Sequence, residues 1–220
     1  MIEIPEGEFL LPLFPLPTVV FFPHTRLPLH IFEPRYREMV ADVLKGNCLI
    51  GMVLLKPGWE KEYFEAPPVF AFGTVGEIER FVQFEDGRYN IVLNGIVRYR
   101  ILETVAESPY RIARVVADPE LPVRDEDSID QRGRLVGLAE RYLKHTPGDT
   151  DIPELETAAF DSIVNALVMA LNIDPTDRQR LLEMEAISER TKKVVDHLER
   201  TLEVVEFLAP YRVGGDPGYN

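Results

Sequence analysis

The sequence opens with a proline-studded apolar stretch, Leu11-Pro12-Leu13-Phe14-Pro15-Leu16-Pro17, which continues through Phe22-Pro23 to Leu27-Pro28-Leu29-His30-Ile31-Phe32-Glu33-Pro34-Arg35-Tyr36. Up to about Pro119 the sequence keeps this pattern, in which short β-prone runs are separated by Pro and Gly. Beyond that point proline is sparser, and apolar residues recur with the 3.6-residue period of a helix. We therefore predict an α+β fold with a β-rich first half and a helical second half.

Two prolines mark the predicted boundary, in Asp118-Pro119-Glu120-Leu121-Pro122-Val123. Prolines so close together disfavour a helix and suit an extended connector. We predict a β-rich subdomain over residues 1–119, a helical subdomain over residues 120–210 and a disordered tail over residues 211–220, which contains Gly214-Gly215-Asp216-Pro217-Gly218.

Turn signals and alternation predict the strands of the first half. Asp86-Gly87 separates two β-prone runs and predicts a hairpin, because both central residues of a type I′ turn need positive φ. Asn94-Gly95 predicts a bulge or a second turn, and alternation over residues 96–101 indicates a half-buried strand. One helix is expected to begin at Pro34 and end near Gly46, and to plug one end of a curled sheet. A doubly wound parallel sheet is not expected, because it needs a crossover helix between most strand pairs.

The second half predicts about four helices, each with an apolar stripe. Asp174-Pro175-Thr176-Asp177 supplies an N-cap, a first-turn proline and an acid at the positive end of the helix dipole. The final helix is the longest, with a stripe at Val194, Val195, Leu198, Leu202, Val205 and Leu208. We expect this stripe to pack against its own bundle, with a homodimer as the alternative.

Composition predicts a soluble cytoplasmic protein. The 220 residues are 45% apolar, which is enough for a core without disulfides or metal, and the single Cys48 fits a reducing compartment. The amino terminus is acidic, unlike a secretory signal, and no apolar run approaches the roughly 18 residues that span a bilayer. The net charge of -13 disfavours nucleic acid as a partner.

No motif in the sequence predicts catalysis. Gly46-Asn47-Cys48-Leu49-Ile50-Gly51 has the glycine spacing of a phosphate loop but lacks its Lys, and the following Met52-Val53 indicates a buried strand. No serine lies in a Gly-rich elbow, and the apolar neighbours of Cys48 indicate an inert thiol. His145 and His197 lie on different helices, without the spacing of a metal site. We therefore expect no enzyme, no cofactor and no metal.

The opening stretch resembles the start of the Lon protease N-terminal domain. Further segments agree with that family in order and spacing, so that the resemblance covers most of residues 9–208: Gly73-Thr74-Val75-Gly76-Glu77-Ile78, the run from Asp86 to Ile101, Pro109-Tyr110-Arg111, Leu181-Leu182-Glu183 and the final helix from Ser188. The resemblance implies a twisted β-rich pseudobarrel of PUA-like type with one inserted helix, followed by a helical bundle. The ATPase module and the serine–lysine dyad of full-length Lon have no counterpart in this sequence.

The resemblance also implies a function. It points to a non-catalytic module that binds unfolded or hydrophobic polypeptide segments, or a quality-control adaptor with a separate protease or ATPase as partner. One alternative is RNA binding, since PUA-like folds also recognise RNA, through Arg88, Arg98, Arg100 and Arg111. A scaffold for folded proteins is another, and an unrecognised hydrolase would need a deep pocket with perturbed titrating groups.

Aromatic residues are the candidate peptide contacts. A β-rich surface can bind an extended peptide by adding a strand at a free edge, with side-chain pockets for selectivity. Trp59, Tyr63 and Phe64 lie in a loop-like segment, and the favoured alternative for Trp59 and Phe64 is that they fold back to cover the barrel. Phe14 and Phe22 are further candidates, for which burial in the core is favoured more strongly.

Two charged positions of the family pattern are predicted to be structural. We expect Glu33, at the entry to the first helix, and Arg98 to form a buried pair that fixes helix against sheet.

Overall fold

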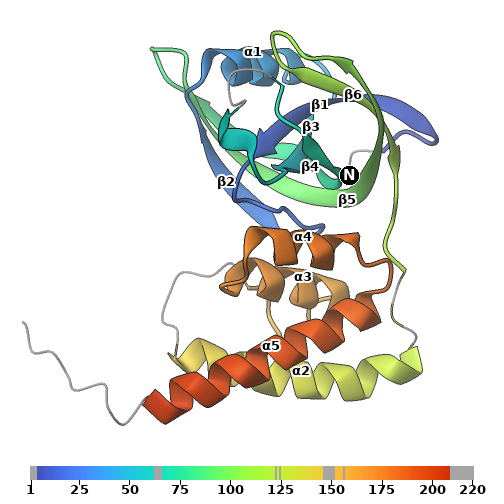
Figure 1. Ribbon diagram of the computed structural model, residues 1–220, viewed down its shortest axis with the longest axis vertical. Coiled ribbons are helices and arrows are strands. Elements are labelled where there is room, and N and C mark those ends of the chain that lie inside the picture. The colour runs from blue at the N-terminus through green and yellow to red at the C-terminus, as the bar shows by residue number, and fades with distance from the viewer. Residues whose placement is uncertain are drawn as a thin grey trace, which may run out of the picture.

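The structure is a computed structural model that describes residues 4–61, 66–121, 123, 125–145, 152–155 and 157–208, without the side chains of residues 61 and 125–130. All of its strands precede four of its five described α-helices, which confirms the α+β class (Figure 1). The elements are β1 (Glu8–Leu16), β2 (Arg26–Ile31), α1 (Pro34–Val43), β3 (Leu49–Leu55), the 3-10 helix η1 (Trp59–Lys61), β4 (Val69–Gln83), β5 (Tyr89–Ala106), β6 (Arg111–Ala117), α2 (Asp125–His145), α3 (Phe160–Ala170), α4 (Pro175–Glu183) and α5 (Ile187–Leu208).

Five strands close into the predicted pseudobarrel. β1 pairs with β3 in parallel, and the ring continues through antiparallel pairs of β3 with β4, β4 with β5, β5 with β6 and β6 with β1. Because β6 pairs with both β5 and β1, the sheet returns to its start, and most strand edges are occupied.

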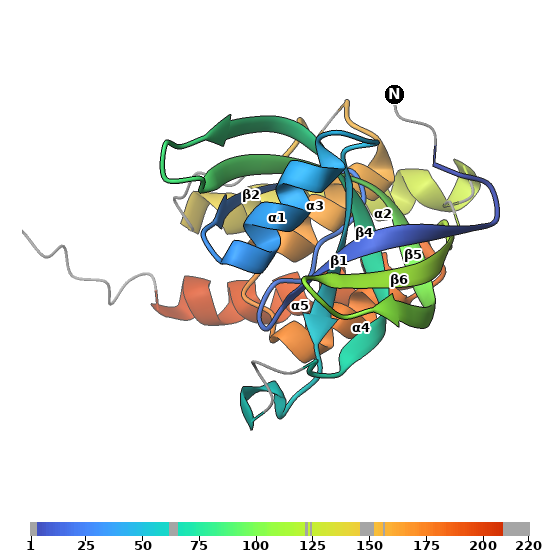
Figure 2. The same cartoon turned by 90° about the horizontal axis from the view of Figure 1, so that it is seen from above.

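A three-stranded extension, which we call the arm, projects from this ring. It consists of β2 (Arg26–Ile31), Ile78–Gln83 of β4 and Tyr89–Asn94 of β5. It exists because β4 continues past Glu77, the last of its residues that pairs with β3. In addition, β2 pairs only with β5. The arm is the green hairpin with the blue strand beside it in Figure 2.

The predicted hairpin joins β4 to β5, with a different turn from the one expected. Phe84 donates its N–H to the carbonyl of Arg88 and accepts from the N–H of Gly87, so three residues form the loop. Only Gly87, at φ +82°, takes a positive φ, where a type I′ turn would need two such residues. Directly after Asn94-Gly95 the register of the β4–β5 ladder shifts, because Gly95 lies opposite Gly76 and Val97 lies opposite Val75. Ile96 is therefore the extra residue of a bulge, and the chain does not turn here.

Three apolar clusters fill the interior. The barrel is filled by residues such as Leu11, Val75 and Tyr99. The second cluster lies under α1, whose stripe of Tyr36, Met39, Val40 and Val43 is buried against the sheet as predicted. The third belongs to the helical half and also takes in side chains of the barrel: Val20, Phe22 and Leu54.

The stripe of α5 packs largely as expected. Val194, Val195, Leu198 and Leu202 are buried in the helical cluster, whereas Leu208 at the end of the helix is exposed. Residues 211–220, predicted to form a disordered tail, lie outside the described residues. The subdomain boundary at residue 119 stays a prediction.

The predicted pair of Glu33 and Arg98 is wrong. Glu33 accepts a hydrogen bond from Arg35, whereas Arg98 forms an ion pair of 2.8 Å with Asp118. The register explains the difference: Ile31, just before Glu33, lies opposite Tyr89 of β5. Arg98 lies nine residues further along that strand, where β5 faces the helical half.

Candidate peptide-binding surface

The three predicted aromatic contacts that the structure describes, Phe14, Phe22 and Trp59, do not form one site. Phe14 and Phe22 are 6% and 0% exposed and belong to the core, so a peptide cannot reach either one, and we withdraw both as binding residues. Trp59 is half-buried in η1, while Tyr63 and Phe64 lie outside the described residues. The loop that carries η1 lies at the bottom of Figure 2, on the opposite side of the barrel from the arm.

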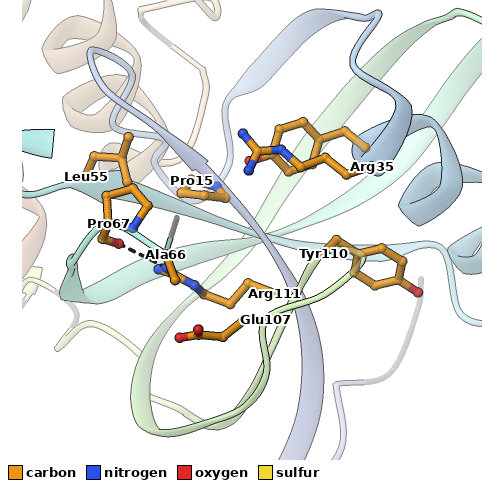
Figure 3. A pocket seen from close by; sticks show the side chains of 9 residues that line it. Pro15, Arg35, Leu55, Ala66, Pro67, Glu107, Tyr110 and Arg111 are labelled. Carbon is orange, nitrogen blue, oxygen red and sulfur yellow. Dashed lines mark hydrogen bonds between the residues drawn. The ribbon is translucent and has the colours of Figure 1, made fainter. Parts of the chain in front are cut away.

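A small pocket lies between this loop, β1, the start of α1 and the turn before β6 (Figure 3). Its volume of about 30 Å³ admits a water molecule, and is far below the roughly 300 Å³ of a small ligand site. On its wall, Arg111 donates a hydrogen bond of 3.0 Å to the carbonyl of Pro67 and so holds the returning loop. The pocket therefore marks the place where the loop is held against the barrel, and it is too small to be a ligand site.

The neighbouring Tyr110 ties the same turn to α1. Its hydroxyl donates to Oδ2 of Asp42 at 3.1 Å. Hydrogen bonds from Lys45 and, to a lesser extent, Tyr110 hold the pKa of Asp42 below its ordinary value. Burial, and then the bond to Asp42, raises the pKa of Tyr110. The segment Pro109-Tyr110-Arg111 that matches the family pattern thus fastens the loop and α1 to the barrel.

The arm offers a larger surface, which we call the outer face. In β2 and in Tyr89–Asn94 of β5 the odd-numbered residues turn toward α1 and the even-numbered residues turn away from it. Residues directly opposite each other share a face, and the pairs of Pro28 with Val92, Arg80 with Val92, and Val82 with Asn90 therefore place an apolar strip on the outer face. Val82 is 59% exposed.

Two open grooves follow this strip. One, of about 580 Å³, runs over the arm toward the hairpin, and the other, of about 670 Å³, runs between the arm and α3, where Ala166 and Met169 line it. The two grooves share Pro28, Arg80 and Val92, so they form one continuous surface.

Aromatic rings gather at the hairpin end of the outer face. The ring of His30 lies 6.2 Å from the rings of both Phe32 and Phe84, and its Nδ1 bonds Asn90 at 2.7 Å. The guanidinium of Arg88 lies 5.8 Å from the centre of the Phe84 ring. Phe32 is 60% exposed, so this cluster can contact a ligand.

The arm is electrically balanced on an acidic protein. Residues 26–31 and 78–94 contain three arginines, Arg26, Arg80 and Arg88, and three acids, Glu79, Glu85 and Asp86, while the whole chain carries -13. Arg26 pairs with Glu79 at 2.9 Å and lowers the pKa of that carboxyl. The backbone N–H and the side chain of Arg88 likewise lower the pKa of Asp86.

The four arginines of the RNA alternative do not form a basic face. Arg98 is 1% exposed and Arg111 is also buried, each bonded to backbone carbonyls. Arg100 and Arg88 are exposed, but Arg88 is paired with Asp86 at 2.7 Å. Phosphate recognition needs clustered cations that solvent can reach, and this set lacks them.

Sequence reasoning missed the outer face, although one signal was present. Phe81 and Val82 are consecutive apolar residues in a strand, and consecutive residues point to opposite faces. One of the two must therefore be exposed unless both faces are covered. The sequence does not show that the helices of the second half reach only the margin of the arm and leave its outer face uncovered.

The fold is that of Lon N-terminal domains, as two solved structures show. The structure of a Lon N-terminal domain protein from Xanthomonas campestris has a TM-score of 0.62 at 26% identity, covering 86% of this chain and 98% of that one. The N-terminal domain of the Lon protease of the Mycobacterium avium complex has a TM-score of 0.69 and covers 87% of this chain and 98% of that one; at 14% identity it shows the fold alone.

The chain belongs to the family described as the ATP-dependent protease La (LON) substrate-binding domain, which matches residues 10–200. It is 29% identical over 203 residues to the Lon protease of Anaeromyxobacter dehalogenans, covering 89% of this chain and 24% of that protein. Lon protease 2 of Myxococcus xanthus is 28% identical over 211 residues, covering 93% of this chain and 25% of the relative. The chain thus spans about a quarter of the length of the curated relatives it matches. Among the described helices, none has the length and apolar character needed to cross a membrane.

Proposed function

We propose that the protein is a non-catalytic recognition module that binds extended hydrophobic segments of unfolded polypeptides on the outer face of the arm. The carrying observation is the apolar strip of the exposed Pro28 and Val82 and the half-buried Val92, which runs from the aromatic cluster to α3. Contiguous apolar surface of this kind marks interaction sites on soluble proteins. Membership of the substrate-binding family supports the same function.

The charge of the surface supports a peptide over nucleic acid. The arm has no net charge, so it neither attracts a phosphate backbone nor adds to the repulsion that an acidic protein exerts on acidic segments. A role as an adaptor for a separate protease or ATPase, and a cytoplasmic location, remain predictions from the sequence.

Fluorescence polarisation with a labelled, unstructured ten-residue peptide rich in Val and Phe tests this function. We expect Val82→Asp to weaken binding at least tenfold, because burying one valine contributes about 1.5 to 3 kcal/mol and a buried charge costs more. Val105→Asp is the matched control, since Val105 is an exposed valine near the far end of β5. Equal affinity of both variants and the native protein would place the site elsewhere.

Two further titrations separate the alternatives. Trp59→Ala reports on the loop between β3 and β4, and a loss of binding there instead of in Val82→Asp would move the site to the loop. Single-stranded RNA, titrated at physiological salt, should show no saturable binding. RNA binding without peptide binding would overturn the proposal, and silence from both ligands would favour a scaffold for folded partners.

A further inference from the structure

The arm ends in two strand edges, and they differ in chemistry. β2 pairs with β5 on one side, and Arg80–Gln83 of β4 likewise pairs with β5 on one side, whereas Ile78 still bonds the carbonyl of Cys48 on the other. Among the described residues no other strand pairs with either edge. An unpaired edge exposes backbone N–H and C=O groups that can accept another strand.

The edge of β4 has its hydrogen-bonding groups free. Phe84 donates to the carbonyl of Arg88, so this pair bonds across the hairpin. Bonded and non-bonded pairs alternate in an antiparallel ladder, which makes Val82 and Arg80 the next residues that bond toward β5. The N–H and C=O groups of Phe81 and Gln83 therefore point away from β5, into open space.

The edge of β2 is interrupted by a proline. Val92 bonds toward Arg80 on β4, so its opposite partner Pro28 is a non-bonded residue of the β2–β5 ladder. The missing N–H of Pro28 lies on the free side, between Arg26 and His30, where it removes the middle donor of that edge. Proline at an edge protects it against strand addition, and residues 78–83 of β4 contain none.

We propose that the extended hydrophobic segment binds as an added β-strand along the free edge of β4, bonded to the backbone of Phe81 and Gln83. This inference rests on the proposed function and specifies its binding mode. Alternate side chains of the added strand extend the outer face beside Val82. The remaining side chains enter the groove of about 310 Å³ between the hairpin and α1, which Ala41 and Tyr89 help to line.

The dimensions of the edge fit a short peptide and not a second copy of the chain. Glu79–Gln83 spans five residues, or about 17 Å of extended strand. A stable protein–protein interface buries about 1,600 Å², far more than so short a strand pair supplies. Two copies, each with a net charge of -13, also repel each other, whereas a neutral apolar peptide does not.

A pair of substitutions at one position tests the mode. Gln83→Pro removes the outward N–H without removing a bond to β5, and the extended backbone at Val82 tolerates a following proline. Gln83→Ala keeps the N–H and loses the same side chain. We expect the ten-residue Val/Phe peptide to bind Gln83→Ala nearly as well as the native protein, and Gln83→Pro at least tenfold more weakly, with unchanged circular dichroism.

The peptide and the amides supply two independent readouts. The same peptide with N-methyl groups on its four central residues should bind at least tenfold more weakly, because it has lost its strand donors. In hydrogen-exchange NMR, the amides of Phe81 and Gln83 should exchange quickly in the free protein and at least tenfold more slowly with the unmethylated peptide. This readout does not depend on the fold of any variant.

The outcomes distinguish the mode from the function. In one outcome Val82→Asp abolishes binding, but N-methylation of the peptide and Gln83→Pro leave the affinity unchanged, and the peptide does not slow the exchange of the Phe81 and Gln83 amides. The peptide-binding function then stands and strand addition is overturned. If no peptide binds the native protein, both fail. A doubled mass in light scattering that Gln83→Pro returns to that of one chain would assign the edge to a second copy and overturn the proposal.

Discussion

Two arginines, Arg98 and Arg190, are buried where the barrel meets the helices. Arg190 forms an ion pair with Glu120 of the connector and donates to the carbonyl of Leu181 at 2.8 Å. Arg98 donates to the carbonyls of Leu182 and Met184 at 3.0 and 2.7 Å. A guanidinium stays charged in the interior, so these bonds must replace its hydration. The connector over residues 118–123 and the carboxyl end of α4 are therefore both bonded to the same two arginine side chains.

Replacing one member of this network should be costly. Arg190→Met leaves the Glu120 carboxylate buried without its cation, and we expect the free energy of unfolding in urea to fall by about 3 to 5 kcal/mol. Arg180→Met, which breaks an exposed pair with Asp177, is the control and should cost less than about 1 kcal/mol. The double variant with Glu120→Leu should recover part of the loss; no recovery would show that the ion pair is not the cause.

Asp42 gives a prediction in pH. Its pKa is held below 3.8 by hydrogen bonds from Lys45, the larger cause, and Tyr110. A carboxyl with a lowered pKa in the folded state stabilises the protein above its unfolded-state pKa, and this contribution is lost as pH falls through the folded-state pKa. Tyr110→Phe should raise the pKa of Asp42 without restoring its ordinary value, in an NMR titration of the side-chain carboxyl. Lys45→Gln should raise it more, and the reverse order would contradict this assignment.

Helix α4 shows how short elements depend on their ends. It has nine residues, too few for a stable isolated helix. At its start Oδ1 of Asp174 accepts the N–H of Thr176 at 2.8 Å, and on its barrel side Gln179 donates to the carbonyl of Phe72 at 3.1 Å. Its carboxyl end bonds Arg98 and Arg190.

The N-cap of α4 can be tested without disturbing the rest. Asp174→Ala removes the acceptor and should lower the free energy of unfolding by about 1 kcal/mol in urea. Asp174→Asn keeps an acceptor oxygen and should cost only a few tenths of that amount. Equal losses in the two variants would mean that charge, and not the capping bond, carries the effect.

Local patterns predicted the elements but not what covers them. Alternation over residues 96–101 predicts a half-buried strand with Arg98 and Arg100 on one face, and the two residues do share a face, opposite Thr74 and Phe72 of β4. Only Arg100 is exposed, because the end of α4 covers that face at Arg98. The end of α4 lies more than 80 residues away along the chain, so no local pattern reports this contact. The prediction that Glu33 pairs with Arg98 was wrong for the same reason, because no local pattern shows which segments meet in the fold.

At the scale of the whole molecule, the two halves share one apolar cluster. Phe22 of the barrel lies within the cluster of the helices, and the guanidinium of Arg190 lies 5.2 Å from the centre of its ring. The side-chain amide of Asn165 donates to the carbonyl of Pro23 at 3.1 Å. Separating the halves would expose this apolar cluster to water and break the bond between Asn165 and Pro23, so we expect the halves to unfold together.

Phe22→Ala tests this coupling, because it removes a ring from the shared cluster and should lower the free energy of unfolding by about 3 to 5 kcal/mol. In urea, the fluorescence of Trp59, the single tryptophan, follows the barrel, and circular dichroism at helix wavelengths follows mainly the bundle. The two signals should change at the same urea concentration in the native protein and should shift together in the variant. Phe32→Ala is the control, since its exposed ring lies outside the three apolar clusters of the interior. A tryptophan transition that shifts while the helical transition stays in place would show that barrel and bundle fold as independent units.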